Sequence, residues 1–329
     1  MKNLTTMSLL MYPIRHEFYK TTNLEVIEIL SDFSAENISK LFHKFEGVKL
    51  NFDELKEKIP NIPIHTAKTL LRLSREPSIR ELIEAYMLSY ELYNLNILLR
   101  ARLNGNTDKN LFLFDYSAVT SKAELLKLEK IDEIKKVYFK VLTFYKIKSK
   151  KLRDTLRIVS VDNINELLLY SSIEYYRSLV SKGANFGHSL ENILKTKAFY
   201  ELLLTLAKIK FLANANVEKY ISDLSFLGGK QELLANIFVS TKESFVKKCI
   251  DYDILPPNFI LTDIDDIDRL KNTLLKLECK RLIIGTPMDP ATIIGIIILR
   301  EIDMKNYFSI LGGFVSGFPF EKVRQLLVL

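Results

Sequence analysis

The amino-acid sequence predicts an all-α protein, and three features indicate this class. Residues 78–255 contain no proline, and residues 106–182 contain neither glycine nor proline. Proteins built from strands and turns need these residues about every dozen positions, so long helices joined by short polar turns are favoured. Apolar residues recur at helical spacing, whereas runs typical of strands are few, and the best of them, residues 282–284, is short.

Three apolar stripes predict helices along the middle of the chain. Their residues recur mostly three or four positions apart, so each stripe covers one helix face. Lysines and arginines fill the other face of the second stripe. In chain order the stripes are Leu82, Ala85, Tyr86, Tyr90, Tyr93, Ile97 and Leu98; Ile131, Ile134, Tyr138, Val141, Leu142, Tyr145, Leu152, Leu156 and Val159; and Phe199, Leu202, Leu203, Leu206, Ile209 and Leu212.

Capping residues predict where helices start and stop. Ser78 is expected to begin one helix, and Thr262, which is followed by aspartates, is expected to begin another. Glycine ends helices because it adopts the left-handed conformation without strain. Helix ends are therefore expected at Gly105, Gly183 and Gly317.

Length and composition set further bounds. The 329 residues suggest two or three domains, and the mean hydropathy of +0.06 indicates that partners cover some apolar surface. Two cysteines cannot build a disulfide scaffold or a zinc cage, so a reducing, intracellular setting is expected. The longest uncharged run near the C-terminus, residues 306–320, is too short for a membrane span of about 20 residues. Residues 3–14 lack the cleavage site of a signal peptide.

A weak internal repeat relates two segments at an offset of 212 residues. Each segment has an acid, an asparagine three residues later, a leucine five further on and a glycine after six more, and each follows a proline, Pro77 or Pro290. A middle copy would fall near Asp223, without the asparagine. Three helical units of about 100 residues each agree with ordinary domain sizes. Their expected bounds are 1–106, 107–230 and 231–329. The matched residues are Glu91, Asn94, Leu99 and Gly105, and Asp303, Asn306, Leu311 and Gly317.

The two repeated asparagines form the centre of a packing or interface motif. Each follows its acid by three residues, so acid and amide share a helix face. A buried amide in mid-helix must bond to another segment. A packing hydrogen bond between neighbouring helices is favoured over a contact with another unit or a partner, and Arg100 and Arg102 have helix ends or neighbouring acids as candidate partners. The motif comprises Glu91, Asn94, Arg100, Asp303 and Asn306.

Three short segments resemble functional motifs, and each lacks a required residue. Residues 228–231 resemble a phosphate-binding loop, but Leu224 and Gln231 stand where glycine and serine or threonine are needed. Residues 313–317 miss the nucleophile elbow by one residue, and residues 263–268 lack the glycine and glutamate of a calcium loop. Residues 228–231 are interpreted as a helix-ending turn, residues 313–317 as part of a helix, and residues 263–268 as a charged helix start.

No catalytic, cofactor-binding or metal site is expected. The four histidines share no ligand spacing, the two cysteines are 30 residues apart, and no carboxylate pair stands out. These residues are His16, His43, His65, His188, Cys249 and Cys279.

Positive charge is concentrated in residues 122–157. This segment has 12 Lys or Arg against 5 Asp or Glu, a difference of +7 that equals the net charge of the whole chain. It is interpreted as a solvated face, as a patch for nucleic acid or anionic lipid, or as a dock for an acidic partner. Nucleic acid is the least supported because no recognised binding motif accompanies the charge.

Taken together, the sequence resembles the C subunit of archaeal-type (A/V-type) rotary ATP synthases, a relative of the d subunit of vacuolar ATPases. Three stretches carry the likeness: the helix end from Glu91 to Gly105, the segment Phe199-Tyr200-x-Leu-Leu, and the terminal stretch 290–329. The resemblance implies three similar helical units in a pseudo-three-fold funnel. It also implies a non-catalytic rotor subunit, without a cofactor, that couples the membrane rotor ring to the central stalk during proton- or sodium-driven ATP synthesis or ATP-driven ion pumping.

The expected partners are therefore the ring and central-stalk subunits, and no nucleic acid. The chain is expected at the cytoplasmic face of the cell membrane as a peripheral protein that reaches the membrane through the ring. The alternative is an unrelated helical-repeat scaffold or regulatory protein, which would show repeats of about 30 to 45 residues. An enzyme of unknown type is a third class, and it would need a pocket with convergent polar groups.

Overall fold

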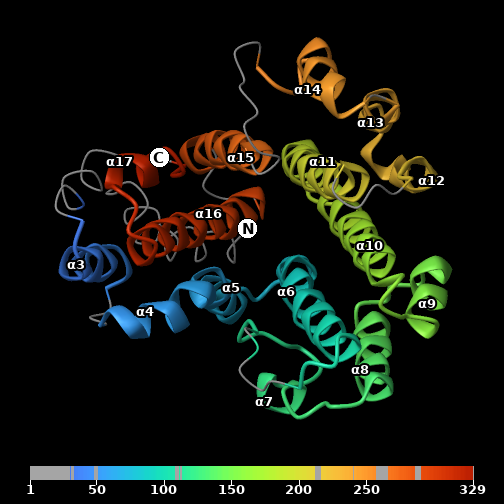
Figure 1. The fold of residues 1–329 in the computed structure, drawn as a ribbon, viewed down its shortest axis with the longest axis horizontal. Coiled ribbons are helices and arrows are strands. Elements are labelled where there is room, and N and C mark those ends of the chain that lie inside the picture. Colours follow the sequence, from blue (N-terminus) through green and yellow to red (C-terminus); the bar gives the residue numbers. More distant parts are fainter. Residues whose placement is uncertain are drawn as a thin grey trace. The chain divides into compact units, whose positions relative to one another are not determined.

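The computed structural model describes residues 30, 33–47, 51–107, 111, 113–211, 216–239, 241–256, 266–285 and 290–328. His16, Leu212 and Thr262 lie outside these ranges. The described residues form helices and turns and contain no strand, which confirms the all-α class (Figure 1). Residues 282–284, the best strand-like run, lie inside helix α15 (Asp266–Gly285). Within the described residues, no helix has both the length and the apolar character needed to cross a membrane.

The chain divides into two compact units. Unit 1 combines Met1–Ile83 with Asn272–Leu329, and unit 2 is Glu84–Lys271. Helix α6 (Pro77–Leu103) and helix α15 each run across a boundary. The division into three helical units at residues 106 and 230 stays a prediction.

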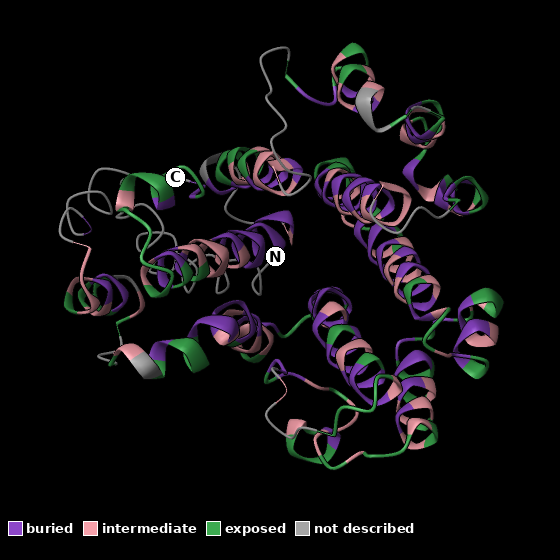
Figure 2. Ribbon diagram, in the orientation of Figure 1, coloured by how far each residue is buried: buried purple, intermediate pink, exposed green. Residues whose placement is uncertain are grey.

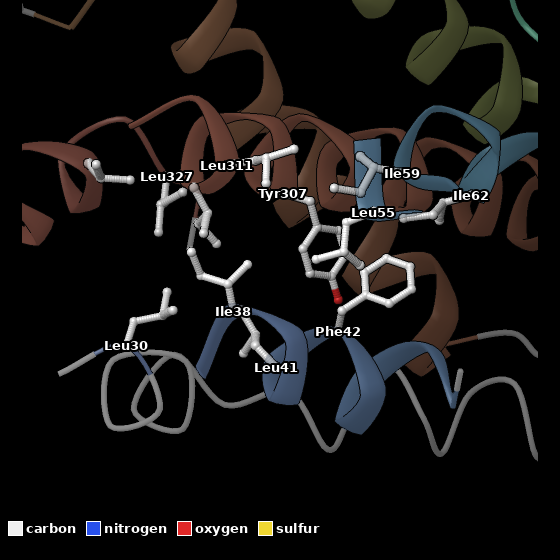
Figure 3. Close-up of a cluster of buried hydrophobic side chains, with 12 residues drawn as sticks. Leu30, Ile38, Leu41, Phe42, Leu55, Ile59, Ile62, Tyr307, Leu311 and Leu327 are labelled. Carbon is white, nitrogen blue, oxygen red and sulfur yellow. The ribbon is translucent and has the colours of Figure 1, made fainter. Parts of the chain in front are cut away.

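Unit 1 is built around the long helix α16 (Pro290–Val315), which packs against α5, α3 and α17. Its first half is buried on every side (Figure 2), as expected for a helix that is apolar all round. Further along, Tyr307 packs against Phe42, with ring centroids 5.3 Å apart, inside the cluster drawn in Figure 3. The other helices are α3 (Ala35–Glu46), α4 (Phe52–Lys58), η1 (Ile59–Asn61), α5 (Ile62–Leu73) and α17 (Phe320–Arg324).

Apart from Leu82, which belongs to unit 1, the described residues of the three predicted stripes lie in unit 2. The first lies on α6 and the third on α11, while the second is shared by α8 and α9, because the chain turns at Lys146, which has a left-handed φ of 58°. The helices are α7 (Lys122–Leu125), α8 (Ile131–Phe144), α9 (Lys150–Arg157), α10 (Ile164–Ala184), α11 (His188–Phe211), α12 (Glu218–Ile221), η2 (Ser222–Leu227), α13 (Lys230–Phe238) and α14 (Lys242–Asp251).

Two predicted helix boundaries lie one residue from the observed ones and have a different physical cause. Helix α6 begins at Pro77 rather than being capped by Ser78, because proline suits a first turn whose N–H groups lack helical partners. Gly183 is the next-to-last residue of α10 but does not close it in a left-handed conformation; it is buried, and a Cβ there would lie 2.4 Å from Leu194 of α11. Its small size permits close packing of α10 on α11, and Gly187, with φ 105°, makes the turn between them.

Candidate functional site

Asn94 binds the backbone of the chain that follows its helix. Its side chain is fully buried in α6, and its Nδ2 donates to the carbonyls of Phe114 (3.0 Å) and Tyr116 (3.3 Å). Its Oδ1 accepts a hydrogen bond from the Phe114 N–H at 2.8 Å. One amide therefore satisfies three buried backbone groups and attaches the segment after α6 to the helix.

Asn306 makes the same kind of contact from α16. Its Nδ2 donates to the carbonyl of Val328 (3.2 Å), and its Oδ1 accepts from the Val328 N–H (2.9 Å). Lys276 donates to the same carbonyl at 3.0 Å, and burial lowers the pKa of this lysine to about 8. In both repeats the asparagine thus holds a backbone segment of its own chain, 20 or 22 residues downstream.

The acids of the two repeats differ in what they bind. Glu91 is buried and accepts hydrogen bonds from the Ser117 hydroxyl (2.6 Å) and the Val119 N–H (3.1 Å). Asp303 instead pairs with Arg300, one turn earlier on the same helix, at 2.8 Å. The two copies of the repeat therefore share the contacts of their asparagines but not those of their acids.

The two arginines near the end of α6 also bond within the chain. Arg100 donates to the Asn165 side chain of α10 at 2.8 Å. Arg102, mostly buried, donates to the carbonyls of Leu128 (3.0 Å) and Asn106 (2.7 Å). Arg102 therefore bonds backbone carbonyls just beyond the helices, where helix ends or acids were expected as its partners.

The ends of α6 and α16 are matched at the 212-residue offset. Each ends with a left-handed glycine, Gly105 (φ 72°) or Gly317 (φ 67°). In each, the glycine N–H donates to the carbonyl three residues back and the next N–H donates to the carbonyl five back. Both glycines thus end their helices as predicted and with the same hydrogen bonds, while their equivalence within repeated units stays a prediction. The donor–acceptor pairs are Gly105 to Arg102 and Asn106 to Ala101 in α6, and Gly317 to Phe314 and Phe318 to Gly313 in α16.

Replacing Gly312, inside α16, and Gly317, just after its end, with alanine should change the stability of the protein in opposite directions. Gly317→Ala is expected to lower the free energy of unfolding by about 1–2 kcal/mol, because a left-handed residue with a Cβ is strained. Gly312 is helical and exposed, and no atom lies within 4 Å of the position that a Cβ would take, so Gly312→Ala is expected to raise it by about 0.5–1 kcal/mol. Urea unfolding of both variants measures this. Equal effects would show that the conformation of Gly317 is not required.

A partly buried ion network in unit 1 was not predicted from the sequence. Arg300 of α16 pairs with Glu46, the last residue of α3, and with Asp303, and the Tyr307 hydroxyl donates to Glu46 at 3.4 Å. Burial raises the pKa of Glu46 despite the attraction of Arg300. The partners are 254 residues apart, and in the sequence each looks like one more surface charge, so no local pattern predicts their pairing.

The family of this protein follows from a comparison with known protein families. The family described as ATP synthase (C/AC39) subunit matches residues 28–326. The chain belongs to this family. The match covers α3 to α17, and therefore both matched helix ends and the ion network. No curated protein matches the chain significantly.

In this C/AC39 subunit, the lysine of the segment that resembles a phosphate-binding loop is used in packing. Lys230 begins α13, donates to the Thr196 hydroxyl at 3.2 Å and lies over the Phe199 ring. Burial lowers its pKa. The turn ahead of it is closed by Gly228 (φ 62°), which follows the end of η2.

The histidines, cysteines and acids of the C/AC39 subunit that the structure describes do not come together in one site. Among the described residues, no three His, Cys, Asp or Glu side chains group to hold a metal ion. Cys249 and Cys279 are buried and not joined in a disulfide, and burial raises the pKa of Cys249 to about 12. Asp268 lies in the first turn of α15 and pairs with the buried Lys271, whereas residues 263 and 265 lie outside the described residues.

Proposed function

We propose that this chain is the non-catalytic rotor subunit that couples the membrane rotor ring to the central stalk of an A/V-type ATP synthase. The observation that carries the proposal is the match of residues 28–326 to the ATP synthase (C/AC39) subunit family. The resemblance to the C subunit implies the coupling role, at the cytoplasmic face of the membrane. Coupling would operate in proton- or sodium-driven synthesis and in ATP-driven pumping.

A subunit that passes torque needs stiff elements, and the matched helices supply them. Each of α6 and α16 is followed by a segment that an asparagine holds to the helix. Each is also closed by the same glycine hydrogen bonds at its end. Satisfied buried polar groups restrict motion because breaking them leaves costly unpaired donors and acceptors.

Three units in a pseudo-three-fold funnel remain part of the proposal. The equivalent ends of α6 and α16 support a relation between units 1–106 and 231–329. For the middle unit, the expected copy near Asp223 falls in η2, and we place it instead in α11. This helix carries Tyr200-Glu201-Leu202, which repeats Tyr90-Glu91-Leu92 of α6, with leucine at the position of Asn94. Glu201 accepts a hydrogen bond from the buried Lys271, as Glu91 accepts bonds from the segment after α6.

The end of α16 is the surface that we propose to face another subunit. Phe308, Gly312 and Val315 are exposed along one side of it. At the 212-residue offset, Phe308 and Gly312 correspond to Asn96 and Arg100 of α6. Those two side chains bond to α10, at Ser171 and Asn165. The proposed occupant is therefore an apolar helix of a ring or stalk subunit, which would cover α16 as α10 covers α6.

Binding to membranes that carry the rotor ring tests this function. The chain is expected to stay bound in 1 M salt, because a packed apolar interface is not screened. Val315→Asp is expected to weaken this binding at least tenfold. The matched control is Val239→Asp, at a similarly exposed valine of unit 2, and it should bind as the unmodified chain does.

Two results would contradict the proposed function. One is release of the chain from ring-bearing membranes by salt, or equal binding to membranes without the ring. The other is ATP turnover by the purified chain that disappears in Lys230→Met, since that would assign chemistry to the loop-like segment.

A further inference from the structure

Seven lysines on and around α8 and α9 form an exposed surface, here called the lysine surface. All seven side chains are exposed. Among the described residues, none of their ammonium groups forms an ion pair with a carboxylate. They are Lys127, Lys130, Lys136, Lys140, Lys146, Lys148 and Lys150.

The other cations of α8 and α9 bond to groups of the same chain. Lys151 bonds both carboxylate oxygens of Asp223, at 2.7 and 2.8 Å. Lys135 donates to the carbonyl of Arg157 (2.9 Å), and Arg157 in turn pairs with Asp154. Arg153 donates to a backbone carbonyl at 2.8 Å. Both arginines are thus engaged, and the cations left for a partner on these two helices and the turn between them are all lysines.

Exposed apolar side chains lie among these lysines. Lys136, Lys140 and Phe144 follow one another at four-residue spacing, opposite the buried face of α8. The Phe144 side chain is 52% exposed at the end of this row. Ile158, 71% exposed, follows α9, and the bond from Lys135 to the Arg157 carbonyl keeps it near α8.

The chemistry of the lysine surface favours lipid headgroups over protein or nucleic acid. Protein interfaces are depleted in lysine and enriched in arginine, and arginine is the residue that recognises phosphates with a two-pronged fork. A fluid anionic surface needs only point charges on flexible stems, each contributing about 1 kcal/mol, and apolar side chains that enter the interface.

We propose that the lysine surface binds anionic lipid headgroups, with Phe144 entering the interface between them. This contact is separate from the ring interface of the proposed function and does not depend on it. It would act only at short range, because the attraction fades within about 10 Å at 0.1 M salt.

Flotation with protein-free vesicles tests the proposal. The chain is expected to bind phosphatidylglycerol/phosphatidylcholine vesicles, to be released in 1 M salt, and not to bind pure phosphatidylcholine. The variant Lys136→Gln/Lys140→Gln/Lys146→Gln should bind about 100-fold more weakly, since three contributions of about 1 kcal/mol are removed. Phe144→Ala should bind several-fold more weakly.

The matched control removes three exposed lysines elsewhere, as Lys58→Gln/Lys247→Gln/Lys280→Gln, and should bind as the unmodified chain does. Equal loss in both triple variants, or no binding to anionic vesicles, would overturn the proposal. So would a lysine-surface variant that binds vesicles normally but loses low-salt binding to ring-bearing membranes, because the partner would then be an acidic protein. Ring binding in 1 M salt is a separate readout and reports on the proposed function alone.

Discussion

Replacing Asn94 with alanine is expected to lower the free energy of unfolding by about 3 kcal/mol. The Asn94 side chain is fully buried and serves the Phe114 N–H, the Phe114 carbonyl and the Tyr116 carbonyl. A buried polar group that loses its partner costs about 1–3 kcal/mol, and alanine leaves three such groups. Urea unfolding measures the loss, and hydrogen exchange should show that the Phe114 amide is no longer protected.

Asn306→Ala is the matched control, because this residue makes the same kind of contact at a partly exposed position. It is expected to cost only about 1 kcal/mol, since Lys276 still donates to the Val328 carbonyl. If Asn94→Ala were no more destabilising than Asn306→Ala, the segment after α6 would not depend on its asparagine.

Replacing Arg300 with methionine is expected to cost about 3 kcal/mol of stability at pH 7. The change leaves Glu46 charged and without its arginine in a site where only about an eighth of its side chain is exposed. Removing one partner of a buried pair is strongly destabilising for this reason. The double variant Glu46→Leu/Arg300→Met removes both charges and should recover most of the loss. A double variant as unstable as the single one would show that Arg300 acts through packing alone.

The loss in Arg300→Met should depend on pH. Burial raises the folded-state pKa of Glu46 above its unfolded value, so the carboxyl favours folding when protonated, and this contribution is lost as pH rises through the folded pKa. Without Arg300 the pKa of Glu46 rises further, and the penalty should be smaller at pH 5 than at pH 7, by about 1.4 kcal/mol for each unit of additional shift. Denaturant unfolding at the two pH values checks this, and Glu46→Gln should remove the difference.

The sequence predicted those parts of the fold that depend on near neighbours. The absence of proline and glycine from long stretches indicated helices, and helices α8 to α11 lie where it did. Gly105 and Gly317 were predicted as helix ends and make identical terminal hydrogen bonds. Helix α10 ends one residue after Gly183, but the left-handed turn is made by Gly187, because a glycine that permits close helix packing looks, in the sequence, like one that ends a helix.

The candidate site was predicted only as a set of residue types. The spacing of Glu91 and Asn94 indicated a buried amide that needs partners, and the partners could not be identified from the sequence because they lie in a loop 20 residues away. The basic charge of residues 122–157 was evident, but not its division between exposed lysines and arginines that bond within the chain.

The sequence alone therefore determined the helical class, the repeated helix ends and the place of the excess charge, because each arises from periodicity and backbone preference within a few turns. Only the tertiary structure decided which charges and amides become buried together. Glu46 and Arg300 meet across 254 residues, and that meeting depends on α16 being buried against α3 and α5. Burial of a polar group is a property of the packed core, and its free energy depends on neighbours that the chain brings together only when it folds.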